Sequence, residues 1–184
     1  VTVLEPAALT ADTTAQDSVS CNGLADGSAS VLGLGGNGVY TYQWDLAAGG
    51  QIGDTATNLL AGTYTVTITD QKGCFKDTTV TVLEPDALLI ASMSMDSASC
   101  NGVADGTATA NGITGGNGNN SFSWNTTPVQ TTNPAIALAA GNYTVTVTDQ
   151  KGCFTTRDTT VLEPDALLIA SMSMDSASCN GVAD

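Results

Sequence analysis

The sequence repeats internally at the interval that separates Cys21 from Cys100. This repeat constrains what the chain can fold into more strongly than any other feature of its sequence. Residues 61–74 return almost unchanged as residues 140–153, and residues 86–105 are identical to residues 165–184. Self-similarity at a fixed interval is the signature of a repeat array, in which each period folds as one structural unit. We therefore expect several copies of one small domain joined in tandem.

The phase of the repeat divides the chain into four parts. Two complete repeats are expected, at residues 7–85 and 86–164. Residues 1–6 have the sequence that closes a repeat, so we expect the last strand of a preceding repeat there. Residues 165–184 have the sequence that opens one, so we expect the first strand of a following, incomplete repeat. Both ends are expected to continue into a longer protein.

The most regular stretch of each repeat predicts a β-strand followed by a turn. In residues 63–69, threonines alternate with Tyr64, Val66 and Ile68. This period of two is typical of a strand with one face on the core and the other in water. Asp70 and the glycine three residues later supply the residue types of a tight turn.

Each repeat predicts an all-β, immunoglobulin-like sandwich. About seven short strands separated by turns, without helical periodicity, are typical of two packed antiparallel sheets. Trp44 and Trp124 end a predicted strand and should lie against the core. Tyr64, just after a Leu-x-Ala-Gly sequence, fits the tyrosine corner of such folds. Because the linker at residues 84–86 is short and contains proline, we expect an elongated, end-to-end array.

The charge of the chain excludes some partners. Asp and Glu number 18, Lys and Arg only 4, and the formal net charge is −14. So acidic a surface disfavours nucleic acids and anionic membranes, because both add negative charge. No apolar run approaches the length of a membrane span, so we expect none in this segment.

Catalysis is not expected in this segment. The chain has no histidine and few cations, which leaves a nucleophile without a base and an oxyanion without a charged partner. We therefore predict that the segment is not an enzyme, with no catalytic or cofactor-binding residues.

Aspartates recur at one phase of the repeat, at Asp26, Asp105 and Asp184. We favour local hydrogen bonds from the turn backbone to these side chains, as is common in such sequences. The alternative is a calcium site, because calcium binds several carboxylate and carbonyl oxygens. One carboxylate per turn is too few to predict a metal, so Asp26 and Asp105 are only weak calcium candidates.

The cysteines predict disulfides in an oxidising compartment. They stand at fixed phases of the repeat, without histidine or a Cys-x-x-Cys pair, which argues against zinc. Two pairings are open. One lies within each repeat, and the other crosses between repeats. The first joins Cys21 to Cys74 and Cys100 to Cys153, and the second joins Cys21 to Cys153.

The expected topology favours the pairing across repeats. Cys21 follows the first strand of a sandwich and Cys74 the last strand but one, so these residues lie at opposite poles. A strand of about seven residues separates the poles by roughly 23 Å, whereas a disulfide needs Cα atoms within about 7 Å. In an end-to-end array Cys21 would face Cys153, while Cys100 and Cys179 would await later repeats and Cys74 an earlier one.

The order of motifs in each repeat resembles the SprB-type repeat. The motifs are Cys-Asn-Gly-x-Ala-Asp-Gly, Gly-Gly-x-Gly, Tyr-x-Tyr-x-Trp, Leu-x-Ala-Gly-x-Tyr-Thr-Val-Thr-x-Thr-Asp-x-x-Gly-Cys and Val-x-Glu-Pro. The second repeat departs from this pattern at residues 119–122, where one Phe replaces an aromatic pair. Repeats of this type build large surface adhesins of gliding Bacteroidetes and related proteins exported by type IX secretion.

The resemblance implies a structural segment of a long extracellular adhesin or filament on a bacterial cell surface, used for attachment and gliding motility. Its partners would be neighbouring repeats of the same chain and other copies in a filament. The surface glycan or substratum that it contacts is not implied. The alternative function is a passive spacer in a surface-anchored secreted enzyme.

Three serines resemble sites of O-glycosylation in Bacteroidetes. Ser18, Ser97 and Ser176 each follow an Asp and precede an apolar residue, at one phase of the repeat. The repeat alone would also keep these residues in phase, so the pattern does not decide between modification and simple duplication.

Overall fold

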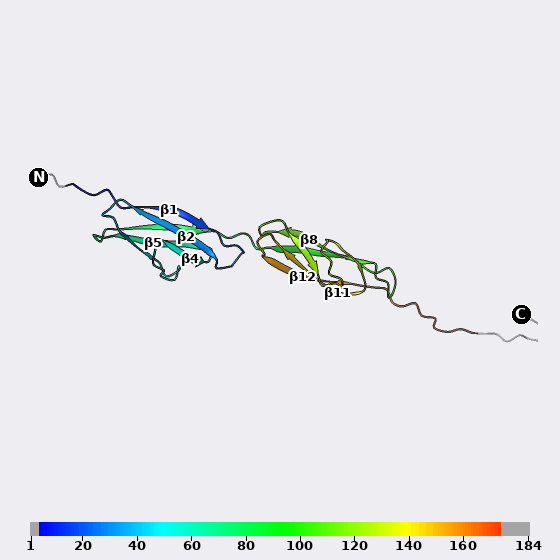
Figure 1. Ribbon diagram of the computed structural model, residues 1–184. Coiled ribbons are helices and arrows are strands. Elements are labelled where there is room, and N and C mark those ends of the chain that lie inside the picture. The colour runs from blue at the N-terminus through cyan, green and yellow to red at the C-terminus, as the bar shows by residue number, and fades with distance from the viewer. Residues whose placement is uncertain (1–3, 174–184) are drawn as a thin grey trace, which may run out of the picture.

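The computed structural model describes residues 4–173, which fold into two β-sandwich modules lying end to end (Figure 1). Strands β1 to β6 form the first module and β7 to β12 the second. The two chain ends leave the molecule at its opposite tips (Figure 1). Within the described residues, no helix is long and apolar enough to span a membrane.

The twelve strands follow the repeat of the sequence. In the first module they are β1 (Thr10–Asp17), β2 (Gly27–Leu34), β3 (Tyr40–Trp44), β4 (Thr55–Leu59), β5 (Gly62–Asp70) and β6 (Phe75–Val82). In the second they are β7 (Leu89–Asp96), β8 (Gly106–Thr114), β9 (Ser121–Trp124), β10 (Ala135–Leu138), β11 (Gly141–Thr148) and β12 (Phe154–Val161).

Each module consists of two three-stranded antiparallel sheets. In the first module the strand orders are β1-β2-β4 and β3-β5-β6. The second module repeats them as β7-β8-β10 and β9-β11-β12. This division of strands between two sheets is that of an immunoglobulin-like sandwich, so the predicted fold class is confirmed.

The inner faces of the two sheets form a separate core in each module. Tyr64, Val66 and Ile68 are buried, and the alternating threonines of β5 point away from the core, as the sequence predicts. Trp44 and Trp124 are each only 1% exposed. The indole N–H of Trp44 donates to the carbonyl oxygen of Gly53 at 3.0 Å, so its one polar group is satisfied inside the core.

Each module has six strands in the described residues, where about seven were expected. In the first module the missing strand falls in the variable segment between β3 and β4, and in the second it falls between β9 and β10. The segment of the first module is rich in glycine. There Gly49, Gly50 and Gly53 have positive φ, and the only regular pairing is an isolated bridge between Gln43 and Ile52. Backbone with positive φ breaks the extended conformation that a strand requires.

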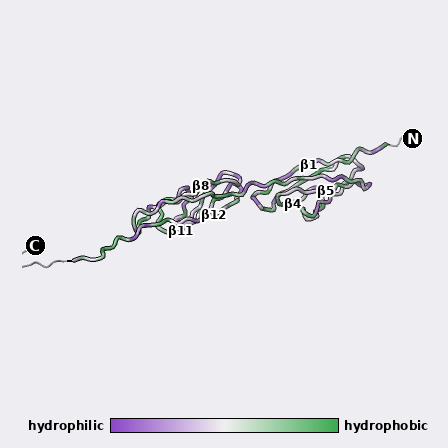
Figure 2. The backbone as a smooth tube through the Cα atoms, turned by 180° about the vertical axis from the view of Figure 1, so that it is seen from behind, coloured by the Kyte–Doolittle hydropathy of each residue, from purple (hydrophilic) through white to green (hydrophobic). Residues whose placement is uncertain are grey.

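The segments outside the two modules form no strand where they are described. Residues 4–9 lead into β1 without regular structure. The hydrophobic residues of the C-terminal tail (Figure 2), Leu167, Leu168 and Ile169, are 98%, 83% and 79% exposed, because neither module offers them a partner strand. Residues 1–3 and 174–184, which include Ser176, Cys179 and Asp184, lie outside the described residues.

The predicted tyrosine corner is present in both modules. The hydroxyl of Tyr64 donates to the carbonyl oxygen of Leu60 at 2.8 Å, and that of Tyr143 donates to Ala139 at 3.0 Å. Each bond ties the start of a strand to the chain four residues earlier. The corner therefore fixes the connection that crosses from one sheet to the other.

Replacing Tyr64 by phenylalanine should lower the free energy of unfolding of the first module by about 1 kcal/mol, the usual net value of one hydrogen bond. The ring keeps its packing, so the loss reports the hydroxyl alone. Urea unfolding monitored by circular dichroism measures it. Tyr143→Phe should have a similar effect on the second module, and unchanged unfolding in both variants would contradict a stabilising corner.

Candidate functional site: the junction between the modules

A disulfide bond joins the two modules. It links Cys21, in the turn after β1, to Cys153, between β11 and β12. The Cα atoms are 5.6 Å apart in space and 132 residues apart in sequence. Cys74 and Cys100 are exposed free thiols, so neither of the two pairings within a module is formed. The bond is the one that crosses between repeats.

The linker between the modules is held against the same turn. The carboxylate of Glu84 accepts a hydrogen bond from the backbone N–H of Gly23 at 2.8 Å. The side-chain amide of Asn22 donates to the carbonyl oxygen of Pro85 at 3.1 Å. These two bonds fix the direction in which the chain leaves the first module, and that direction brings the second module beside Cys21.

The second module receives the linker on a pair of glycines. The N–H of Gly116 donates to the carbonyl oxygen of Asp86 at 2.8 Å. Gly115 has a φ of +73°, and a Cβ atom there would lie only 2.0 Å from the carbonyl oxygen of Ala87. Only glycine allows the linker to pass this close, which explains the Gly-Gly-x-Gly motif at this position.

A buried carboxylate organises the loops at the receiving pole. Asp149 is 5% exposed and accepts four hydrogen bonds. Two come from the backbone and side-chain nitrogens of Asn117, at 2.7 and 2.9 Å, and two from the backbone nitrogens of Lys151 and Cys153, at 2.8 and 3.0 Å. Burial acts to raise the pKa of Asp149, but the bonds from Asn117, Lys151 and Cys153 outweigh it and lower that pKa.

The first module has the same arrangement at its outer pole. Asp70 is 4% exposed and accepts from Asn37 at 2.9 and 2.8 Å, from Lys72 at 2.9 Å and from Cys74 at 3.0 Å. The side-chain bond from Asn37 is the largest influence, and it helps to lower the pKa of Asp70 to about 2. Asp70 therefore makes the hydrogen bonds of the turn predicted for it, and Asp149 makes the same bonds in the second module.

Asn117 also reaches across the junction. Its side-chain nitrogen donates to the carbonyl oxygen of Ser20 in the first module at 2.9 Å, besides its bond to Asp149. One amide thus links the buried carboxylate of one module to the backbone beside Cys21 of the other. The sequence analysis missed this residue, although its recurrence as Asn37 within the Gly-rich motif is a signal that could have identified it.

A shallow cavity of about 350 Å³ lies beside the disulfide. It is lined by Cys21, Asn22, Gly23, Leu24, Ala87, Leu88, Gly152, Cys153 and Phe154. Its walls come from the turn after β1, the linker and the turn before β12, and none of these residues carries a charge. The cavity is the space left where the two poles and the linker meet.

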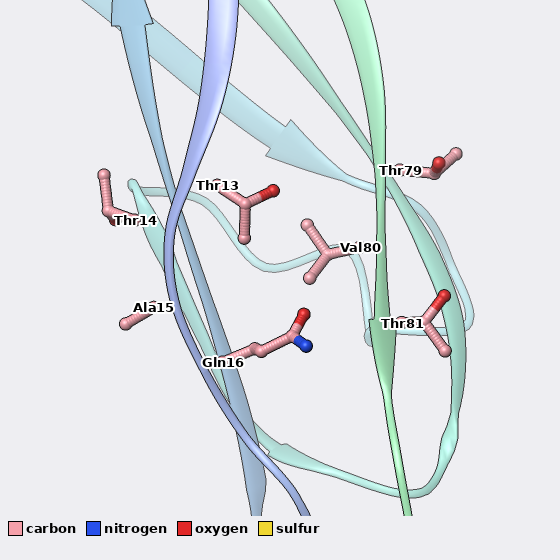
Figure 3. Close-up of a pocket in the computed structure, with 7 residues that line it drawn as sticks. All are labelled: Thr13, Thr14, Ala15, Gln16, Thr79, Val80 and Thr81. Atoms are coloured by element: carbon pink, nitrogen blue, oxygen red, sulfur yellow. The ribbon is translucent and has the colours of Figure 1, made fainter.

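A larger groove of about 580 Å³ lies between the edge strands β1 and β6 of the first module (Figure 3). It is lined by Thr13, Thr14, Ala15, Gln16, Thr79, Val80 and Thr81. Figure 3 shows Thr13, Gln16 and Val80 extending into the space between the strands. None of these seven side chains is charged or can act as a base at neutral pH, so the lining offers no group to activate a threonine hydroxyl.

In the second module a side chain bridges the corresponding pair of edge strands, β7 and β12. The guanidinium of Arg157, on β12, donates to the carbonyl oxygen of Ile90 and, at 2.8 Å, to that of Ala91 on β7. The position one period earlier is Thr78, which is too short to make such a bridge. The two modules therefore share their junction residues but differ along this edge.

The calcium candidates make turn hydrogen bonds. Asp26 accepts from the backbone N–H of Ser20 at 2.8 Å, and Asp105 accepts from Ser99 at 2.8 Å. The hydrogen bond from the serine lowers the pKa of each aspartate. Within residues 4–173, no cluster of three or more His, Cys, Asp or Glu side chains has the spacing of a metal site.

The two described glycosylation candidates lie on the surface at the end of a strand. Ser18 and Ser97 are exposed, while the apolar residues that follow them, Val19 and Ala98, are 3% exposed. The backbone N–H groups of Val19 and Ala98 donate to the carbonyl oxygens of Leu83 and Leu162. Each serine is therefore held outward beside the start of a linker.

Comparison with known families identifies the repeat. The profile of the SprB repeat matches residues 13–49, from within β1 to the turn after β3. The chain carries an SprB repeat. The second module follows the first at the interval of the sequence repeat and has the same strand order, so it is a second copy of the module that carries this match. No curated protein matches the chain.

The chain also matches solved structures at low identity. Three N-terminal domains of the outer capsid protein Hoc of bacteriophage RB49 match at 16% identity and a TM-score of 0.45, covering 85% of this chain and 58% of that one. The DIP-gamma IG1+IG2 structure matches at 11% and 0.35, covering 84% and 98%. An amphioxus IgVJ-C2 molecule matches at 12% and 0.29, covering 69% and 90%. The chain thus spans little more than half of the phage structure.

Asp70 should titrate near pH 2 in the native SprB module, and Asn37→Ala should raise its pKa toward the ordinary value of about 3.9, because the largest stabilising hydrogen bond is lost. Since the folded pKa lies below the unfolded one, the contribution of Asp70 to stability is complete above about pH 4 and disappears as the pH falls toward 2.

Carboxyl titration by NMR measures this pKa, and thermal unfolding between about pH 2 and 5 measures the linked stability. Asn22→Ala, at the opposite pole of the same module, is the matched control and should leave the titration of Asp70 unchanged. A native Asp70 that titrates near the ordinary value in the unmodified chain would rule out the role assigned to Asn37.

Proposed function

We propose that this chain is a stalk segment of a long extracellular adhesin on a bacterial cell surface, in which SprB modules set reach and stiffness. The observation that carries the proposal is the disulfide between Cys21 and Cys153, which joins two sandwiches end to end. Disulfides of this kind persist in oxidising environments outside the cytosol.

The geometry of the junction supports a rod rather than a flexible string. Two covalent connections cross it, the linker and the disulfide. The linker is also bound to the first module through Glu84 and to the second through Gly116. A bend at this point would have to break these hydrogen bonds or move Cys21 relative to Cys153.

The surface chemistry fits a protein exposed to water over its whole length. The outward threonines of β5 and β11 present hydroxyl groups, and the formal charge of −14 opposes lateral association of neighbouring chains. The partners in this proposal are neighbouring modules of the same protein and other copies in a filament. The segment contributes no catalysis, and attachment and gliding motility are the processes that it serves.

Modification of the surface serines is part of the same proposal. Ser18 and Ser97 are exposed and directly follow the ends of β1 and β7. We expect both to be O-glycosylated in the native protein. Mass spectrometry of the natural material should find a sugar on peptides containing them, and unmodified peptides would end this part of the proposal.

The function is tested on intact cells that make the parent protein. Antibody fragments raised against this chain should label unpermeabilised cells. A membrane-impermeant phosphine reductant should lower the shear at which cells detach from a surface, because it opens the junctions without removing the protein. The matched control is the same cells with Cys21 and Cys153 both replaced by serine, in which this junction no longer responds to the reductant.

Two results would contradict the proposal. Labelling only after permeabilisation would place the chain inside the cell. Attachment that does not depend on the modules, together with loss of an enzymatic activity when they are deleted, would favour the spacer of a surface enzyme instead.

A further inference from the structure

The outer poles of the two-module chain carry the same residues as the inner junction. The inner junction has two halves, which we call the turn half-site (Ser20, Cys21, Asn22 and Gly23) and the loop half-site (Asn117, Asp149 and Cys153). A second turn half-site, Ser99, Cys100, Asn101 and Gly102, lies at the far end of the second module. A second loop half-site, Asn37, Asp70 and Cys74, lies at the far end of the first.

The outer turn half-site is already in its junction conformation. The N–H of Gly102 donates to the carboxylate of Glu163 at 2.7 Å, as Gly23 does to Glu84 at 2.8 Å. The side chain of Asn101 donates to the carbonyl oxygen of Pro164 at 3.3 Å, which repeats the bond from Asn22 to Pro85. The chain that leaves the second module is therefore held as it is at the inner junction.

The outer loop half-site is also formed in advance. Asn37 holds the carboxylate of Asp70 with the two bonds that Asn117 makes to Asp149. A side-chain amide carries two N–H donors. Asn117 uses its amide nitrogen on both Asp149 and Ser20, whereas in the described residues that of Asn37 donates to Asp70 alone. Asn37 therefore retains a donor for a carbonyl oxygen of another module.

The two free cysteines belong to these half-sites. Cys100 and Cys74 are exposed, while their counterparts in the inner junction, Cys21 and Cys153, are half-buried by each other's modules. Each free thiol thus stands where a module of the same kind would cover it. The segment that leads into the first module also has the conformation of the linker at the inner junction. The carbonyl oxygen of Ala7 accepts a hydrogen bond from the N–H of Gly36 at 2.8 Å, as that of Asp86 does from Gly116.

We propose that each outer half-site binds the complementary pole of a further copy of this SprB module, and that Cys100 forms a disulfide with the cysteine that lies as far along the chain from it as Cys153 lies from Cys21. This inference rests on the proposed stalk. It adds to that proposal the module that each pole binds and a rule for the cysteine pairing at every junction. The rule is that the cysteine after the first strand of one module bonds to the cysteine before the last strand of the next.

The bond forms by thiol–disulfide exchange with a small disulfide such as oxidised glutathione. The thiolate of Cys100 attacks that disulfide and releases one glutathione thiolate. The thiolate of the partner cysteine then attacks the Cys100 sulfur in the mixed disulfide and releases the second. The two protein thiols lose two protons and two electrons, and two molecules of reduced glutathione are produced.

The test extends the existing chain by one module. Because residues 165–184 repeat residues 86–105, appending a copy of residues 106–164 after Asp184 completes a third module. Cys179 is replaced by serine so that the third module contributes one cysteine, the appended Cys153. The appended copy also carries Phe154→Tyr, so that its cysteine peptide differs in mass from the original.

After refolding in a glutathione buffer, peptide mapping without reduction should find two disulfides in one molecule. One is Cys21–Cys153, the internal control, and the other joins Cys100 to the appended Cys153. Thiol titration should then detect Cys74 as the one remaining free thiol. Thermal unfolding monitored by tryptophan fluorescence checks that the third module is folded.

Asn117→Ala in the appended module tests whether the new disulfide depends on the contacts between the half-sites or only on the closeness of the two cysteines. Loss of its hydrogen bond across the junction should lower the equilibrium constant of the new disulfide against glutathione about fivefold, while Cys21–Cys153 in the same molecule is unaffected. Asn37→Ala is the matched control, because it disturbs the same loop at a pole that has no neighbour, and it should leave both bonds unchanged.

A folded third module with Cys100 left as a free thiol would overturn this inference. So would a disulfide between Cys100 and Cys74, since that pairing ignores the half-sites. Either result, obtained with Cys21–Cys153 intact, leaves the proposed stalk standing. Absence of Cys21–Cys153 from the protein isolated from cells would instead remove the basis of both.

Discussion

The junction depends on one buried carboxylate at the receiving pole. Asp149 gathers the Gly-rich loop and the turn before β12 by accepting four hydrogen bonds. With the carboxylate ionised and fully satisfied, Asn117 and Cys153 are held at fixed positions before any neighbour arrives. A disulfide and a hydrogen bond can then form to the preceding module with little further ordering, which is the general advantage of preorganised sites.

Features that depend on residues close together in the sequence, such as the buried face of a strand, could be predicted. The pole of the module at which each cysteine lies could be predicted too. The alternation around Val66 fixed one face of β5, and the strand order then placed Cys21 far from Cys74. The role of Asn117 does not follow from such local alternation, because its partner Ser20 is 97 residues away. Only the recurrence of the Gly-rich motif, with Asn37 in the first repeat, marks it. The number of strands was overestimated because the segment between β3 and β4, where glycines adopt positive φ, and the glycine-free segment between β9 and β10 both form no strand.

The two modules share the residues of the junction but differ along one edge of the sandwich. Linker, glycine pair, carboxylate and cysteines recur in both modules, and the hydrogen bonds around them have closely similar lengths. The edge between the first and last strands does not recur, since Arg157 bridges it in the second module and the equivalent residue of the first module is Thr78. The poles agree closely, because modules must match each other there, whereas this edge is free to diverge.

The disulfide also decides which parts of the chain can be stretched. Strands β2 to β11 lie between Cys21 and Cys153, inside a closed covalent loop, and only β1 and β12 lie outside it. A freely extended segment of 132 residues would reach roughly 450 Å, but the bond holds its ends at a Cα distance of 5.6 Å. Because the bond closes this loop, tension on the two termini cannot extend the chain between Cys21 and Cys153 unless the sulfur–sulfur bond breaks.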